Sequence, residues 1–158
     1  MEYTFVMIRP GAIRRNKVPF IFEKILEANL KVVCCKPKYL SIEFIYEHYS
    51  HLLNNPNIPE DVFIRTMKEN LSGQVISMIV SGEDAISKTR ELIGPSNVQR
   101  AINEFPNSIR ALGDPNNNPD NLIHASDSVE SANEEIKRFL GIDINNTKDI
   151  TQQLLLIR

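Results

Sequence analysis

Short strand-like segments alternate with amphipathic helical segments along this chain, and that order limits the folds open to it. Residues Tyr3–Ile8 read YTFVMI, a β-rich run that ends at the turn signal RPG. Residues Lys31–Leu40 predict a second strand, in which Pro37 favours a sheet edge or a bulge because proline cannot donate to a strand ladder. Residues Gln74–Val80 are apolar almost throughout and predict a central strand covered on both faces.

Helical periodicity fills the segments between these strands. Ser41 can cap one helix at its start, and Ser72-Gly73 is a stop signal for another. Asp127 is followed three residues later by Glu130, which is the spacing of a capping box, so this pair predicts the start of the last helix. The expected helices are Val18–Ala28, a segment after Ser41, Glu60–Leu71, Glu83–Ile93 and Asp127–Phe139, the last one ended by Gly141.

The stretch Gly94–Asp120 has little periodicity and is rich in proline and asparagine. A connection of this length inside a compact domain is usually either functional or disordered, and the residues alone leave both open. Residues Asn121–His124 follow it and predict a short fourth strand.

This order of elements predicts an α+β fold. Helices between three or four strands are typical of a ferredoxin-like split βαβ sandwich, in which helices pack on a four-stranded antiparallel sheet. We expect the helices to cover one face of that sheet. At 158 residues the chain is expected to form one domain, which we place at residues 1–141, with residues 142–158 as a C-terminal extension.

Composition and charge exclude several classes of protein. The net charge is −2, which argues against a generally basic nucleic-acid binder but allows a local basic pocket. The apolar runs are too short to span a membrane, and the first residues resemble a strand rather than a signal peptide. The adjacent Cys34 and Cys35 predict two small core residues, and nothing suggests a disulfide framework. We therefore expect a cytoplasmic protein, with a mitochondrial location left open.

One histidine stands directly before a run of Ser, Asp and Glu. His124 is either a loop histidine beside a helix cap or a nucleophile, because a neutral imidazole can attack with one nitrogen while an acceptor holds the other. Guanidinium groups suit phosphate, since each can donate two parallel hydrogen bonds. No GxxxxGK[S/T] or GxGxxG motif occurs, so a nucleotide would have to bind in another way. The arginines near expected element ends or in the long stretch are Arg9, Arg14, Arg15, Arg90, Arg100 and Arg110.

Several motifs together resemble the nucleoside diphosphate kinase family. Residues Asn121–Ala132 read NLIHASDSVESA, which is similar to the family's N-x-x-H-G-S-D-S signature with Ala125 in place of glycine. The stretches TFVMIRP, YEHY, LSGQVISMIV, TRELIGPS and PNSIR follow in the family's order. The resemblance runs from Tyr3 to Leu140 and points to the divergent branch of the family.

The resemblance implies a ping-pong phosphoryl transfer. His124 would take the γ-phosphate of a nucleoside triphosphate and pass it to a nucleoside diphosphate. Mg²⁺ would arrive with the nucleotide phosphates, so no dedicated protein metal site is expected. The resemblance implies that Arg90 and Arg110 bind phosphate and that Ser96 replaces a phosphate-binding threonine. It also implies that Asn121 binds the sugar and that Tyr49 lies near the terminal phosphate. Ser126 and Glu135 match the residues that support and orient His124.

Three departures from the family pattern affect the nucleotide site. Arg9 stands where the family has a phosphate-contacting lysine, so the charge is kept but its shape changes and turnover could suffer. Gly11-Ala12 replaces an Asp-Gly pair, so the turn backbone is expected to differ. Val62 stands where the family has an aromatic residue against the base, which predicts a weaker stacking surface.

These departures favour one alternative, a nucleotide-binding regulatory member of the same fold with little or no turnover. An RNA-binding module is disfavoured because the aromatic strand motif of such modules is missing and the charge is slightly acidic. The expected partners are nucleoside di- and triphosphates, with no membrane partner and nucleic acid disfavoured. The resemblance also implies a homo-oligomer, with a hexamer favoured and a dimer or tetramer as alternatives.

Overall fold

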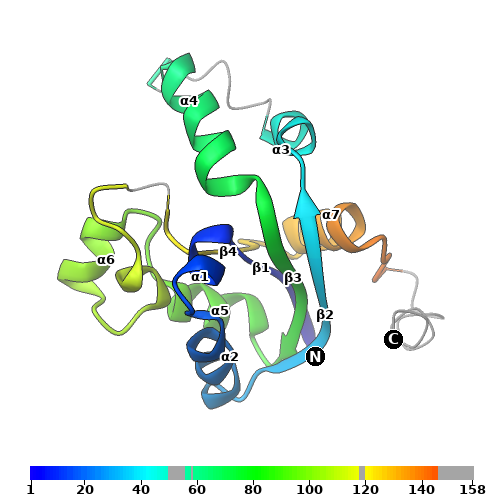
Figure 1. Cartoon of the computed structure of the whole chain (residues 1–158). Helices are drawn as coiled ribbons and strands as arrows, with labels where there is room; N and C mark the ends of the chain where they lie inside the picture. Colours follow the sequence, from blue (N-terminus) through cyan, green and yellow to red (C-terminus); the bar gives the residue numbers. More distant parts are fainter. Residues whose placement is uncertain (50–55, 58, 118–119, 146–158) are drawn as a thin grey trace.

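A four-stranded antiparallel sheet forms the centre of the chain in this computed structural model (Figure 1). The structure describes residues 1–49, 56–57, 59–117 and 120–145. The strands are β1 (Glu2–Ile8), β2 (Lys31–Leu40), β3 (Gly73–Gly82) and β4 (Ile123–Ala125), and they lie in the order β2-β3-β1-β4. The predicted ferredoxin-like α+β fold with a four-stranded antiparallel sheet is therefore confirmed.

β2 is an edge strand, as Pro37 predicted. The register between β2 and β3 is irregular at Val32 and Cys34, which marks a bulge. Beyond it Cys34 is buried while Cys35 is exposed, because neighbouring side chains of a strand point to opposite faces. The expectation that both cysteines are core residues is wrong for Cys35.

The helices largely follow the predicted periodicity. The backbone N–H of Phe44 donates to Ser41 Oγ over 3.2 Å, so Ser41 caps its helix as expected. Two short pieces of helix, Val98–Glu104 and Ile109–Leu112, lie in the stretch that showed no period. The helical elements are α1 (Pro10–Arg14), α2 (Val18–Glu27), α3 (Ile42–Tyr49), α4 (Glu60–Thr66), the π-helix η2 (Met67–Leu71), α5 (Ala85–Ile93), α6 (Val98–Glu104), the 3₁₀-helix η3 (Ile109–Leu112) and α7 (Val129–Leu140).

Both ends of α7 are well defined. Ser128 rather than Asp127 is the N-cap, since its side chain accepts a hydrogen bond from the backbone N–H of Ser131. Asp127 instead accepts from the Ser131 hydroxyl over 2.5 Å. Gly141 ends the helix in the left-handed conformation at φ 71°, which glycine adopts without strain.

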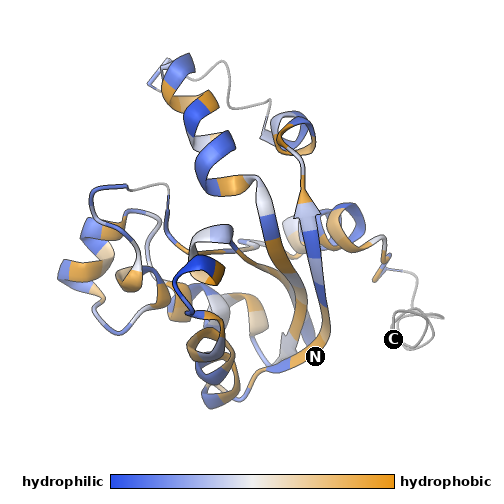
Figure 2. Ribbon diagram, viewed as in Figure 1, coloured by the Kyte–Doolittle hydropathy of each residue, from blue (hydrophilic) through white to orange (hydrophobic). Residues whose placement is uncertain are grey.

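Helices cover both faces of the sheet, and the expectation that they would cover one face is wrong. Alternate residues of β1 point to opposite sides: Phe5 and Met7 join one apolar cluster, and Val6 and Ile8 join another. The first cluster includes residues of α3, η2 and α7, and the second includes residues of α1, α2 and α5. Figure 2 shows that the helices carry both hydrophobic and hydrophilic residues, as expected for helices that pack one side on the sheet and expose the other.

The C-terminal end of the described chain packs against the first of these clusters. Ile142 is buried there at 1% exposure. Residues 146–158 lie outside the described residues, so the domain boundary at 141 stays a prediction. Within the part of the chain that the structure describes, no helix is long and apolar enough to cross a membrane.

Candidate active site

The pairing of β4 with β1 fixes the position of His124. His124 lies opposite Met7 in the antiparallel register, at the middle of the three-residue strand β4. Its side chain is 23% exposed, so the ring is accessible from one side. His124 therefore lies in the predicted short fourth strand and not in a loop, while its role as nucleophile stays a prediction.

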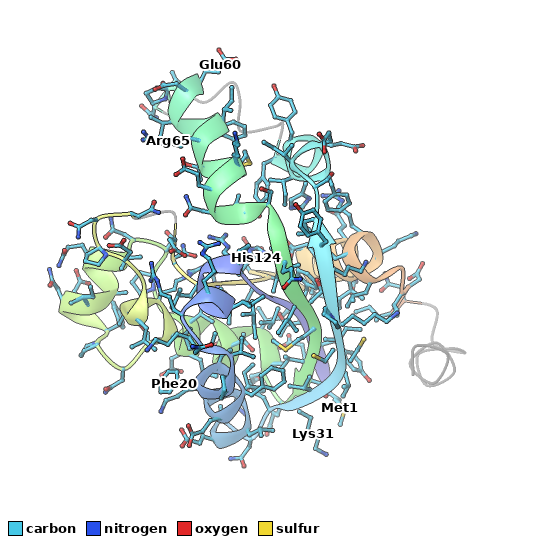
Figure 3. All side chains as sticks on the ribbon, viewed as in Figure 1. Met1, Phe20, Lys31, Glu60, Arg65 and His124 are labelled. Carbon is cyan, nitrogen blue, oxygen red and sulfur yellow. The ribbon has the colours of Figure 1, made fainter. Side chains whose placement is uncertain are left out.

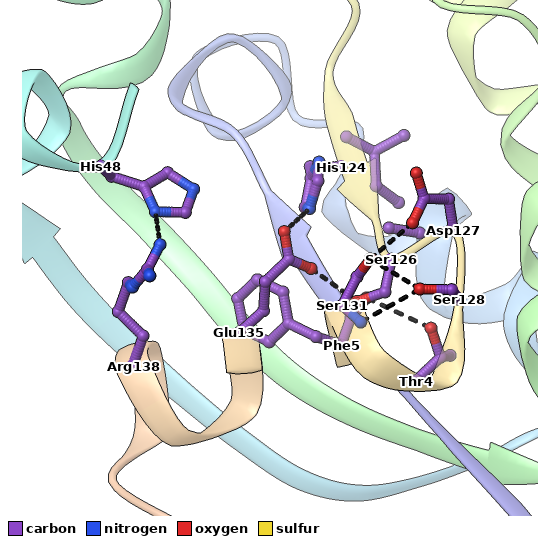
Figure 4. Close-up of polar contacts among 12 residues, drawn as sticks. Thr4, Phe5, His48, His124, Ser126, Asp127, Ser128, Ser131, Glu135 and Arg138 are labelled. Atoms are coloured by element: carbon purple, nitrogen blue, oxygen red, sulfur yellow. Dashed lines mark hydrogen bonds and ion pairs between the residues drawn. The ribbon is translucent and has the colours of Figure 1, made fainter. Parts of the chain in front are cut away.

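α7 returns to this strand and brings Glu135 to the histidine. His124 Nε2 lies 2.8 Å from Glu135 Oε1, and the Ser126 hydroxyl donates to Glu135 Oε2 over 2.5 Å (Figure 4). A carboxylate can only accept, so Nε2 carries the hydrogen, and in the neutral tautomer that this hydrogen bond selects the lone pair lies on Nδ1. The three predicted residues thus form one hydrogen-bonded row.

Opposing effects set the ionisation of Glu135. Burial raises the pKa of this carboxyl, but the hydrogen bond and charge of His124 and the hydrogen bond of Ser126 outweigh burial, so the pKa lies below its ordinary value. Glu135 is therefore an anion at neutral pH and holds the imidazole in one tautomer.

Asn121 joins two other predicted residues. Arg9 Nη1 donates to Asn121 Oδ1 over 2.7 Å, and Asn121 Nδ2 donates to the Ser96 carbonyl over 3.1 Å. Burial lowers the pKa of the Arg9 guanidinium from its ordinary value, and Tyr49 and Asp120 offset part of that effect. Ser96 itself is exposed.

Arg110 is a buried cation, held by backbone carbonyls. It donates from Nη1 to the Gly94 carbonyl over 2.9 Å and from Nη2 to the Ile123 carbonyl over 3.1 Å. Burial, together with the positive charges of Arg9 and Arg90, lowers the pKa of Arg110 to about 9. The guanidiniums of Arg9, Arg90 and Arg110 repel one another, so an anion such as phosphate that binds between them would be stabilised.

Tyr49 and Arg90 complete the group around the histidine. Burial and the Glu135 carboxylate raise the pKa of Tyr49, while Arg9, its hydrogen-bond partner, opposes this shift. Tyr49 therefore stays a neutral phenol beside both residues. Arg90 is exposed and its Nη1 lies 3.5 Å from the Ala125 carbonyl, next to His124 in the chain.

Val62 lies apart from this group. It belongs to the first part of α4, where its carbonyl accepts a hydrogen bond from the Thr66 hydroxyl over 2.8 Å. Figure 3 shows Glu60 and Arg65 of the same helix well away from His124. The structure thus brings the other predicted site residues together, whereas Val62 belongs to the helix whose labelled residues lie away from His124.

Two further pairs were not singled out from the sequence. Arg15 Nη2 donates to Asp120 Oδ2 over 2.6 Å, so this arginine binds a carboxylate in the described structure. Asn117 Nδ2 donates to Asn70 Oδ1 over 3.0 Å. Both pairs join residues far apart in the sequence, and no local motif signals them.

His48 lies beside the site, close enough for its charge to act on Glu135. Arg138 donates to its Nδ1 (Figure 4). The ring of His48 lies edge-on to Phe139. His51 falls outside the described residues.

Comparison with known proteins agrees with this geometry. A sequence model of the family "Nucleoside diphosphate kinase" matches residues 2–143. A nucleoside diphosphate kinase of Encephalitozoon cuniculi is 37% identical over 145 residues, which cover 91% of this chain and 92% of that protein. One from Methanocaldococcus jannaschii is 36% identical, with 90% and 95% of the two chains covered.

Solved structures give the same result. The crystal structure of the E. cuniculi nucleoside diphosphate kinase in its cubic apo form superposes with a TM-score of 0.78 at 36% identity, over 91% of this chain and 92% of that one. The Aquifex aeolicus nucleoside diphosphate kinase superposes with a TM-score of 0.76 at 32% identity, over 87% and 94%. The chain therefore belongs to the nucleoside diphosphate kinase family.

Proposed function

We propose that this nucleoside diphosphate kinase works by a ping-pong mechanism through a phosphohistidine on His124. The observation that carries the proposal is the row in which Glu135 binds both His124 Nε2 and the Ser126 hydroxyl. This row leaves the Nδ1 lone pair as the nucleophile.

The two half-reactions balance around Nδ1 of His124. In the first, the lone pair attacks the γ-phosphorus, the bond to the β,γ-bridging oxygen breaks, and its electron pair leaves with the nucleoside diphosphate. In the second, a terminal oxygen of another nucleoside diphosphate attacks the same phosphorus, and the N–P pair returns to Nδ1. Positioning and charge neutralisation do most of the work in such transfers.

The cationic residues have the role of binding the phosphates. Arg9, Arg90 and Arg110 would spread positive charge over the phosphate oxygens, with Tyr49 close to the transferred group and Asn121 on the sugar. At pH 7 Arg110 is still protonated, because even its lowered pKa is about 9. Ser96 would add a hydroxyl, and Val62 would pack weakly against the base.

The donor set of the site suits phosphate better than a bare cation. It offers guanidinium and amide donors, and its carboxylate Glu135 already binds His124 and Ser126. Among the described residues no group of three His, Cys, Asp or Glu side chains is arranged to hold a metal ion. Mg²⁺ would therefore be held mainly by the nucleotide phosphates, where it supplies charge neutralisation.

Labelling with γ-³²P ATP and Mg²⁺ tests the proposal. We expect an acid-labile, base-stable phosphoenzyme on the wild type and on His48→Ala, none on His124→Ala, and release of the label as GTP when GDP is added. ATP binding without any label would overturn the proposal and favour the regulatory alternative with little turnover. Label that persists on His124→Ala would place the nucleophile elsewhere.

We also propose a homo-oligomer, with a hexamer favoured over a dimer or tetramer. The edge strand β2 supports association, since an exposed edge can pair with another chain and Tyr39 on it is 76% exposed. Light scattering during gel filtration tests this, and a monomer mass of 18.0 kDa at micromolar concentration would overturn it.

A further inference from the structure

A buried asparagine of η2 binds Asn117, which precedes the strand that holds His124. Asn70 is 3% exposed, and its Oδ1 accepts the 3.0 Å hydrogen bond from Asn117 Nδ2. A buried amide is costly unless it is hydrogen-bonded, so this contact has to form for Asn70 to lie where it does. The pair links residues 47 positions apart.

Asn70 is a buried residue of the π-helix η2. The backbone N–H of Ser72 donates to the Met67 carbonyl over 3.0 Å, five residues earlier, which is the hydrogen bond of a π turn. Within this turn Met67, Asn70 and Leu71 are all buried. Met67 and Leu71 pack in the core, and Asn70 meets the loop.

The loop carries this contact on to the phosphate-binding residues. The N–H of Asn117 donates to the Asp114 carbonyl over 3.0 Å, and the N–H of Asp120 donates to the Asn117 carbonyl over 2.8 Å. Asp120 is held by Arg15, and the next residue is Asn121, which binds Arg9. Two hydrogen bonds, from Asp120 to Asn117 and from Arg9 to Asn121, thus connect Asn117 with the guanidinium of Arg9 through two adjacent residues of the chain.

We propose that Asn70 and Asn117 form a latch that positions the Arg9–Asn121 pair for nucleotide binding. The latch joins η2 to Asn117 and, through the hydrogen bond from Asp120 to Asn117, holds Asp120 and the adjacent Asn121 in place before a nucleotide arrives, which lowers the ordering cost of binding. Both asparagines are positioning residues and touch no reacting atom. This inference rests on the proposed function of the site.

The latch predicts an effect on binding rather than on the chemical step. Replacing Asn117 by Asp keeps the size of the side chain, but it removes the N–H donor and sets two oxygen acceptors against each other. We expect Asn117→Asp to raise KM for ATP and GDP about fivefold to tenfold, as the loss of one hydrogen bond implies, with kcat changed less than about twofold.

Asn116→Asp is the matched control. Asn116 is the neighbouring residue and is exposed, and its backbone N–H rather than its side chain binds Asp114. The control introduces the same negative charge one residue away but leaves the hydrogen bond between Asn117 and Asn70 in place, so it should shift KM by less than about twofold. Equal KM shifts in the two variants would overturn the latch.

A double-mutant cycle tests whether the two asparagines act as one unit. Asn70→Leu has a similar volume, and we expect Asn70→Leu/Asn117→Ala to raise KM no more than the worse of the two single variants. Additive effects would overturn the proposal. If Asn70→Leu fails to fold, Asn117→Asp with its control still decides, because Asn117 lies in a surface loop.

Hydrogen exchange gives a readout that does not depend on activity. The amides of Asn117 and Asp120 should exchange about fivefold faster in Asn117→Asp than in Asn116→Asp, and calorimetry should show weaker ADP binding in the former. If the wild type forms no phosphohistidine, these two measurements still test the latch while the ping-pong mechanism fails. Unchanged exchange and unchanged ADP affinity would overturn the latch alone.

Discussion

The carboxylate of Glu135 sets the tautomer of His124, the residue that we propose as nucleophile. Glu135 accepts from His124 Nε2 and from Ser126 at once, with one oxygen for each partner. A glutamine there has one oxygen and one NH₂ group, so it can satisfy one partner correctly but presents a donor to the other.

Glu135→Gln should therefore slow phosphoenzyme formation. We expect the rate to fall about 100-fold, because part of the histidine population adopts the wrong tautomer and the charge that stabilises the ring is lost. Rapid-quench labelling with γ-³²P ATP measures this rate. Glu134→Gln, at the exposed neighbouring position, is the control, and equal rates in the two variants would contradict the role assigned to Glu135.

The same carboxylate makes stability depend on pH. The pKa of Glu135 is lowered in the folded chain from its ordinary value of 4.5, so the anion is favoured by folding. Its contribution to the free energy of unfolding is present above about pH 4.5 and is lost as the pH falls through the lowered folded value. Urea unfolding of the wild type and Glu135→Gln should show a difference that is largest at pH 7 and shrinks below pH 4.5. A difference that stays constant or grows toward low pH would contradict this sign.

The short helix α1 lies against Asp120, three residues before β4, only because residue 11 has no side chain. A Cβ built on Gly11 would lie 1.8 Å from Asp120 Oδ1, far inside any real contact. The family's Asp-Gly pair is replaced here by Gly11-Ala12, and the buried Asp120 occupies the space beside Gly11. The departure seen in the sequence is therefore matched by a carboxylate that contacts the same turn.

Gly11→Ala should destabilise the protein, although the same change in an open helix stabilises by up to about 1 kcal/mol. Here the clash with Asp120 dominates, and we expect a net loss of about 1–3 kcal/mol in the free energy of unfolding. Urea titration measures it. The second change Asp120→Ala removes the obstructing oxygens, so the double variant should lose less than the sum of the two single variants. Fully additive losses would show that the carboxylate is not the cause.

Elements with a strong period were predictable, and elements set by tertiary contacts were not. Val18–Glu27 and Lys31–Leu40 follow from apolar spacing and β-branched content. The helix α6 escaped because it has only seven residues, and its Asn97 cap resembles any other loop asparagine. The π turn at Met67–Leu71 departs from the 3.6-residue period on which the prediction of one continuous helix rested.

The site residues come from segments across the whole chain, and the sequence motifs identified these residues without showing which of them would be in contact. His124, Ser126 and Glu135 lie within 12 positions, so their proximity follows from a strand and the helix after it. Arg9 meets Asn121 across 112 positions only because β1 and β4 are neighbours in the sheet. Such a pair depends on strand order, which local periodicity does not give.

The clustered arginines link nucleotide binding to the stability of the whole chain. Arg110 is buried next to the positive charges of Arg9 and Arg90, which lowers its pKa, so an anion that binds between them relieves a cost of folding. ADP at 100 times its Kd should stabilise the protein by about 2.7 kcal/mol, a rise in Tm of about 5–10 °C. Arg110→Lys keeps the charge but loses the forked donor, so its ADP-induced rise should be clearly smaller.

Differential scanning fluorimetry measures these shifts. Arg100→Lys is the control, because Arg100 is an exposed arginine paired with Glu104 on α6 and should keep the full rise. Both rises should shrink as salt is added, since screening weakens charge-based binding. If Arg110→Lys rises as much as Arg100→Lys, Arg110 does not bind the phosphates, and its burial serves only the Gly94 and Ile123 carbonyls that it already holds.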